Sequence, residues 1–152
     1  MQLTTEIKKA IDQSVLCWLA TVSKEGIPNV SPKEVFNYFE DNSIIVANIA
    51  SPQTIKNIKY NTSICISFID ILVQKGFQIN GKATLVDSSN SDFEVMEKVL
   101  LKITEGKFPF KSITHITIEK VKPIIAPKYI LYPDTTEEEQ ISSALNTYGF
   151  NQ

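Results

Sequence analysis

A strongly apolar segment of this chain is followed at once by polar residues that favour the start of a helix. Residues 44–49 are almost entirely apolar, which is typical of a central strand, and Ser51-Pro52 is a common helix opening. The first turn of a helix has backbone N–H groups without helical partners and carries the positive end of the dipole, so it can hold a phosphate. The polar side chains available to this turn are those of Ser51, Gln53, Thr54 and Lys56. The other interpretation is that Ser51 only caps the helix.

Motifs for other kinds of catalysis are missing from the sequence. His115 is the one histidine, and no acid–base partner stands at a recognisable spacing, so it is expected to be a surface or interface residue of a strand. One histidine and two separated cysteines do not make a metal site, so no metal is predicted. The five glycines are not clustered into a phosphate loop, and no Gly-x-Ser-x-Gly nucleophile motif occurs.

The charge balance restricts the partners. Seventeen acidic residues against fifteen basic ones give a net charge of −2, which argues against a nucleic-acid binder. All the basic residues are lysines, so any anion site must use lysine, hydroxyl, amide or backbone N–H groups. No apolar run approaches the roughly 20 residues of a membrane span, and no secretory signal is visible. Because Cys17 and Cys65 also fit reduced, buried thiols, we expect a cytoplasmic protein.

Hydrophobic periodicity predicts about six strands, with short helices between and after them. In the first strand Trp18 shares a face with Leu16 and Ala20, so it is expected in the core. Capping boxes are predicted at Ser91–Glu94 and Thr136–Glu139. The expected strands cover residues 16–23, 28–39, 44–49, 63–68, 77–85 and 112–126, and the expected helices begin near residues 5, 52, 92 and 137.

This order indicates a mainly β protein with added helices, built as a small antiparallel barrel whose strands mostly follow one another as a meander. No repeat, low-complexity tract or interdomain linker is present. We therefore expect one domain over residues 1–152, with residues 123–152 as a C-terminal extension that ends in a helix.

An ordered set of segments resembles the FMN-binding, pyridoxamine 5'-phosphate oxidase-like split-barrel family. The resemblance covers roughly residues 3–122, in the family's order and spacing. It implies a six-stranded antiparallel Greek-key split β-barrel and a homodimer with FMN at the subunit interface. The segments that carry it are Trp18-Leu19-Ala20-Thr21-Val22, Gly26-Ile27-Pro28-Asn29-Val30-Ser31-Pro32-Lys33, Ile44-Ile45-Val46-Ala47-Asn48, Ser51-Pro52-Gln53-Thr54-Ile55-Lys56-Asn57-Ile58 and Gly76-Phe77-Gln78-Ile79-Asn80-Gly81-Lys82-Ala83.

Carried over by position, the resemblance implies a cofactor-binding set in two parts. The first lies along the flavin ring, with Asn48 at the end of the neighbouring strand, and consists of Ser31, Pro32, Lys33, Glu34 and Asn48. The second surrounds the FMN phosphate or braces its loop, and consists of Ser51, Gln53, Thr54, Lys56 and Asn57. The chain also departs from the oxidase proper, which has Arg in place of Ser31, an Arg-Lys pair in place of Pro52-Gln53, and an Arg-rich segment near its C-terminus.

These departures argue against pyridoxamine phosphate as the substrate, while FMN binding stays expected through the helix start and Lys56. The function implied is that of an FMN-dependent oxidoreductase or electron carrier, with a small-molecule substrate or electron donor and no catalytic side chain assigned. The alternative is a non-catalytic module on the same fold that binds a flavin, a deazaflavin or haem, for which His115 is the one candidate ligand.

Overall fold

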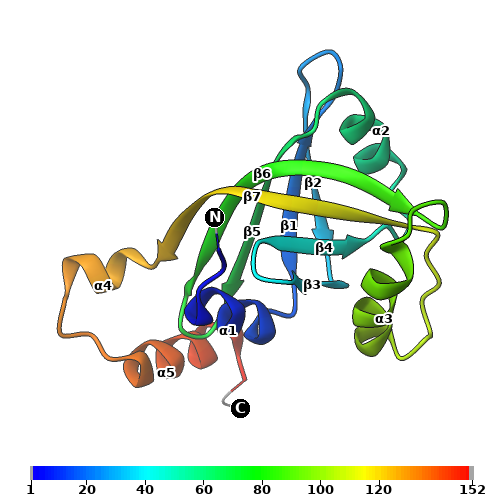
Figure 1. Cartoon of the computed structure of the whole chain (residues 1–152). Coiled ribbons are helices and arrows are strands. Elements are labelled where there is room, and N and C mark those ends of the chain that lie inside the picture. The colour runs from blue at the N-terminus through cyan, green and yellow to red at the C-terminus, as the bar shows by residue number, and fades with distance from the viewer. Residues whose placement is uncertain (1, 151–152) are drawn as a thin grey trace.

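Seven antiparallel strands form one strongly curled sheet in the computed structural model, which describes residues 2–150 (Figure 1). The strands are β1 (Cys17–Val22), β2 (Pro28–Lys33), β3 (Phe36–Phe39), β4 (Ser43–Ala47), β5 (Ser63–Asp70), β6 (Lys75–Asp87) and β7 (Ser112–Ile125), in the spatial order β2-β1-β5-β6-β7-β4-β3. The helices are α1 (Thr5–Gln13), α2 (Pro52–Tyr60), α3 (Phe93–Thr104), α4 (Pro127–Leu131) and α5 (Glu137–Tyr148).

The expected count of six strands is wrong, because the strand predicted over residues 28–39 is two strands. β2 pairs with β1 at one edge of the sheet, whereas β3 pairs with β4 at the other edge. Glu34 and Val35 connect them, so the chain leaves one edge and joins the opposite one within two residues. Only a sheet curled into a half-barrel brings its two edges this close.

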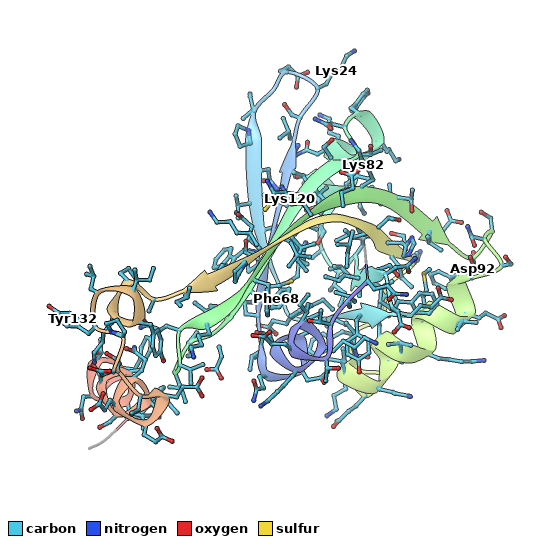
Figure 2. The ribbon with its side chains drawn as sticks, turned by 60° about the vertical axis from the view of Figure 1, so that its left-hand side comes forward. Lys24, Phe68, Lys82, Asp92, Lys120 and Tyr132 are labelled. Carbon is cyan, nitrogen blue, oxygen red and sulfur yellow. The ribbon has the colours of Figure 1, made fainter. Side chains whose placement is uncertain are left out.

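The core lies inside the curl. Leu19, Ile66 and Ile79 are fully buried there, and α1 covers one end with Ile7 and Ile11. Phe68 lies near the centre of the molecule, whereas Lys24, Asp92 and Tyr132 mark its periphery (Figure 2). A second cluster joins α3 to β4 and β7 through residues such as Met96, Leu100 and Ile113.

The predicted core position of Trp18 is wrong, since 47% of its surface is exposed. β1 instead turns Cys17, Leu19 and Thr21 inward. Both faces of this strand carry apolar residues, so alternation alone could not tell which face packs against the core. The consequence is an exposed apolar surface on the outer side of β1.

The two predicted capping boxes have opposite outcomes. At α5 the Thr136 hydroxyl accepts from the N–H of Glu139, and the Glu139 carboxylate accepts from the N–H of Thr136, so this box is confirmed. At α3 the predicted box is wrong, because the helix begins one residue later with Asp92 at its N-cap and without a side-chain cap.

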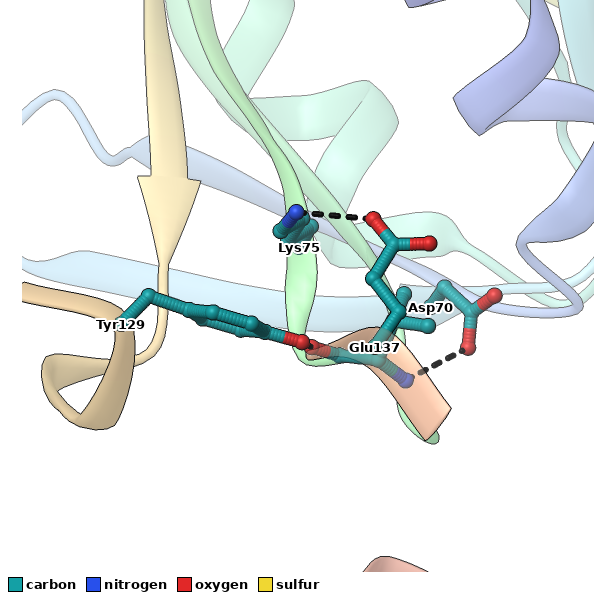
Figure 3. Close-up of polar contacts among 5 residues, drawn as sticks. Asp70, Lys75, Tyr129 and Glu137 are labelled. Carbon is teal, nitrogen blue, oxygen red and sulfur yellow. Dashed lines mark hydrogen bonds and ion pairs between the residues drawn. The ribbon is translucent and has the colours of Figure 1, made fainter. Parts of the chain in front are cut away.

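The C-terminal extension continues from the end of β7 and lies away from α2 (Figure 1). A salt bridge of 2.7 Å joins Glu137 to Lys75, and the Tyr129 hydroxyl donates to the carbonyl of Val73 at 2.8 Å (Figure 3). The hydrogen bond between Lys75 and Glu137 lowers the pKa of Glu137 and raises the pKa of Lys75. Among the described residues, no helix is long and apolar enough to cross a membrane.

Candidate functional site

The turn between β4 and α2 places Ser51 at the N-cap of α2, as predicted, but its side chain does not cap the helix. The Ser51 hydroxyl donates instead to the carbonyl of Ile49 at 2.9 Å. It also accepts a hydrogen bond from the ammonium of Lys33. Ala50 allows this turn by adopting a left-handed conformation, with φ of 48°. The backbone N–H groups at the start of α2 are therefore not capped by Ser51 and remain suited to an anion.

Lys33 connects the end of β2 to the start of α2. Its side chain is buried, with 7% exposed, and it lies opposite the buried Cys17 in the β1–β2 register. Burial lowers the pKa of Lys33 and raises that of the Cys17 thiol. The Lys33 ammonium thus brings a positive charge into a largely apolar environment, where the Ser51 hydroxyl is its hydrogen-bond acceptor.

Asn48 lies just beyond the end of β4 and is held by β7. Its amide nitrogen donates to the Ser112 hydroxyl at 3.1 Å, and its amide oxygen accepts from Thr114 at 2.8 Å. Asn48 thus lies at the strand end, as predicted, but its two hydrogen-bond partners were not predicted from the sequence. Ser112 and Thr114 are 64 and 66 residues away in the chain, so no local spacing signal could have found them.

The predicted residues on α2 divide between its two faces. Thr54 and Asn57 are buried, with 1% of each exposed, whereas Gln53 and Lys56 are exposed. The Asn57 amide nitrogen donates to the Thr21 hydroxyl at 2.9 Å, and the Gln53 amide donates to the Asn57 oxygen at 2.7 Å. Asn57 therefore braces α2 against β1, while Gln53 and Lys56 face solvent.

A hollow of about 260 Å³, here called the Lys33 hollow, lies between the ends of β2 and β4. Three of the predicted ring-side residues, Pro32, Lys33 and Glu34, line it together. Ser31 is not among its lining residues. The remaining walls are mainly apolar and were missed by the sequence analysis: Leu16, Val35, Ala47, Ile49 and Phe108. The hollow thus has mainly apolar walls with the buried cation of Lys33 and the exposed carboxylate of Glu34, a lining suited to a planar aromatic ligand that carries polar edges.

His115 does not belong to this arrangement. It lies half-buried on β7, with its ring edge-on to Phe39 at 6.4 Å between centroids, and burial lowers its pKa. It lines neither the Lys33 hollow nor the neighbouring hollow described below. Within residues 2–150, no group of three or more His, Cys, Asp or Glu side chains could hold a metal ion.

Comparison with known proteins gives one family and many similar folds. The family model described as pyridoxamine 5'-phosphate oxidase matches residues 3–125. No curated protein matches the chain. The crystal structure of HupZ from Group A Streptococcus is similar, with a TM-score of 0.68 and 27% sequence identity over 78% of this chain and 91% of that one.

Two further structures share the fold at lower identity. An FMN-binding protein from Syntrophomonas wolfei subsp. wolfei has a TM-score of 0.67 and 20% identity, covering 79% of this chain and 84% of that one. An F420 reductase has a TM-score of 0.61 and 17% identity, covering 79% of this chain and 97% of that one. At these identities the likeness shows the fold alone.

Proposed function

Because this chain belongs to the pyridoxamine 5'-phosphate oxidase family, we propose that it is an FMN-binding flavoprotein that acts as an oxidoreductase or electron carrier. The contact between Lys33 and Ser51 carries this proposal. It joins the strand expected beside the flavin ring to the helix start expected beside the phosphate, so one bound molecule can reach both. The FMN-binding relative from Syntrophomonas wolfei subsp. wolfei supports the choice of cofactor.

The donor groups at the start of α2 fit the FMN phosphate. The uncapped first turn offers backbone N–H groups, and Gln53 and Lys56 are exposed on its outer side. The helix dipole and the Lys56 ammonium both stabilise a doubly charged phosphate, so no arginine is required. Thr54 and Asn57 are both buried, and their role is to hold α2 in place.

The Lys33 hollow fits the flavin ring. Ile49 and Phe108 offer apolar surface to the ring, and Pro32 and Glu34 line the hollow at the strand end. Bound FMN supplies the redox chemistry, so the chain itself needs no nucleophile. Lys33 supplies a positive charge while it is protonated, and the Asn48 amide holds the neighbouring strand end against β7.

Pyridoxamine 5'-phosphate is not the proposed substrate. The chain contains no arginine, so Ser31 and Pro52-Gln53 stand where the resembled oxidase has basic residues. A second phosphate site comparable to the first is therefore not proposed. The substrate is a different small molecule or electron donor, and the free thiols Cys17 and Cys65 fit the reducing cytoplasm proposed as its location.

The proposed function includes a homodimer. Trp18 lies opposite Pro32, and Ala20 lies opposite Val30, so these residues share the outer face of the β1–β2 edge. Trp18 and Val30 are 47% and 58% exposed, which is a large apolar area for a surface strand pair. Pro32 also lines the Lys33 hollow, so a second copy seated on this face would cover the proposed cofactor.

A visible absorption spectrum tests the proposal. We expect the purified protein, after addition of FMN and desalting, to retain flavin absorption in the blue. Protein that loses all FMN on desalting and does not quench its fluorescence would contradict the proposal. Reduction of the bound FMN by NADH, NADPH or a reduced deazaflavin then separates an oxidoreductase from the non-catalytic flavin-binding alternative.

A further inference from the structure

A second hollow of about 360 Å³, here called the Asp12 hollow, adjoins the Lys33 hollow. It lies between the end of α1, the connection from β2 to β3 and the end of α3. Glu34, Val35 and Phe108 line both hollows, so the two are neighbours across these three residues. A molecule in the Asp12 hollow would therefore lie beside any ring in the Lys33 hollow.

The walls of the Asp12 hollow combine apolar side chains with negative charge. Ile11, Phe36 and Ile103 contribute apolar surface, and Val15 and Phe108 do so while being 82% and 55% exposed. Asp12 and Glu34 are the charged residues of the lining, which contains no lysine. The lining thus offers two carboxylates and no cation to a ligand.

Backbone dipoles add to this negative charge. Ile11, Asp12 and Ser14 belong to the C-terminal end of α1, and Ile103 and Thr104 to that of α3. The C-terminal end of a helix carries a partial negative charge that favours cations. The two helix ends and the carboxylates of Asp12 and Glu34 therefore all favour positive charge at this hollow.

None of the nearby lysines lines the Asp12 hollow itself. Lys107 forms a 2.7 Å salt bridge with Glu105, and Lys8 forms a 2.5 Å salt bridge with Asp41. Lys8 and Lys102 line an adjoining hollow, which shares Asn37 and Ile103 with the Asp12 hollow. Lys33 belongs to the Lys33 hollow, where it donates to Ser51.

We propose that the Asp12 hollow binds small cations with an apolar body and disfavours anions, and that it is the substrate side of the flavin site. Its role as the substrate side rests on the proposed function, whereas the binding preference rests on the hollow itself. The substrate or electron donor is thus a cationic molecule with an aromatic or aliphatic body. A phosphorylated substrate and a polyanionic electron donor are disfavoured.

Two naphthalene compounds of matched size test the preference. The affinities of 1-naphthylmethylammonium and 1-naphthoate are measured by calorimetry at low salt, with the full-length protein and with excess FMN present. We expect the cation to bind at least about threefold more tightly, since interactions with partly exposed charges are modest, and the difference to shrink at high salt. Equal affinities, or tighter binding of naphthoate, would overturn the proposal.

Variants assign the preference to this hollow. Asp12→Asn and Glu34→Gln are exposed changes that keep side-chain size, and each should weaken binding of the cation by roughly threefold without weakening that of naphthoate. Glu94→Gln, an exposed change at the start of α3 outside both hollows, is the matched control and should leave both affinities unchanged. Equal weakening by Glu94→Gln would overturn the assignment.

The same samples separate the two proposals. Retention of FMN after desalting reports on the proposed function, and the cation preference reports on the Asp12 hollow. Protein that retains FMN but shows no charge preference contradicts the inference about this hollow alone. Protein that shows the charge preference but never retains FMN contradicts the flavin assignment and leaves the cation site supported.

Discussion

The side-chain amide of Asn57 donates to the hydroxyl of Thr21 at 2.9 Å, and each of these residues has only 1% of its surface exposed. Asn57 lies on α2 and Thr21 on β1, so this bond ties the helix to a strand 36 residues earlier. The other end of the same amide accepts from Gln53 at 2.7 Å. The position of the α2 N-terminus therefore depends on a buried polar contact as well as on apolar packing.

Replacing Asn57 by alanine should destabilise the protein by about 2–3 kcal/mol, because the buried Thr21 hydroxyl would lose its hydrogen-bond donor and a small cavity would form. Urea unfolding followed by circular dichroism measures the loss. Gln53→Ala, which removes the exposed partner of the same amide, is the control and should cost less than about 1 kcal/mol. Equal losses in the two variants would show that the buried bond contributes little.

Lys33 should make stability depend on pH in the alkaline range. Burial lowers the pKa of Lys33 in the native protein below the ordinary 10.5. At pH values between the native pKa and 10.5, the unfolded chain therefore keeps a proton on Lys33 that the native protein has lost. The free energy of unfolding should therefore rise with pH as the native Lys33 loses its proton, relative to Lys33→Met. Urea titrations of both proteins at several pH values from 7 upward measure the difference, in which the titration of groups that do not interact with Lys33 cancels. A flat difference across this range would contradict the pKa direction.

The sequence predicted the fold class because most strands alternate cleanly and are bounded by turn residues. The expectation failed between residues 28 and 39, where one apolar–polar pattern runs through Glu34 and Val35 without a turn signal. The division into β2 and β3 is decided by the curl of the whole sheet, which places the two segments at opposite edges. Trp18 was assigned to the wrong face for a related reason, since burial depends on which side of β1 meets the core.

The candidate site was predictable where residues are neighbours in the chain and not where the fold brings them together. The start of α2 follows from the local preference of proline, here Pro52, for the first turn of a helix. The pairing of Ser51 with Lys33 spans 18 residues, and Phe108 reaches the Lys33 hollow from a loop after α3. These contacts depend on sheet closure, for which periodicity contains no information.

Lys56 should contribute to FMN affinity through the phosphate group. Lys56→Ala should weaken FMN binding by roughly fivefold and leave riboflavin binding nearly unchanged, because only FMN carries a phosphate. Quenching of flavin fluorescence measures both affinities. Lys59→Ala is the matched control, since Lys59 is also exposed but lies in the last turn of α2, away from the uncapped N–H groups. Similar losses for FMN and riboflavin would place the phosphate elsewhere.

The exposed apolar face of β1 and β2 should hold two copies of the chain together. Trp18→Glu introduces a charge at the centre of this face, where burying it in an interface would be costly, so the variant should be monomeric at concentrations at which the parent protein is a dimer. Light scattering after size exclusion measures the mass. Leu131→Glu is the control, because Leu131 is 70% exposed on α4 in the C-terminal extension, and this variant should remain a dimer. A Trp18→Glu protein that stays dimeric would place the interface on another face.

The same variant should also retain less FMN, since Pro32, opposite Trp18, lines the Lys33 hollow that the second copy would cover. A monomeric Trp18→Glu protein that retains FMN fully would show that one copy completes the site.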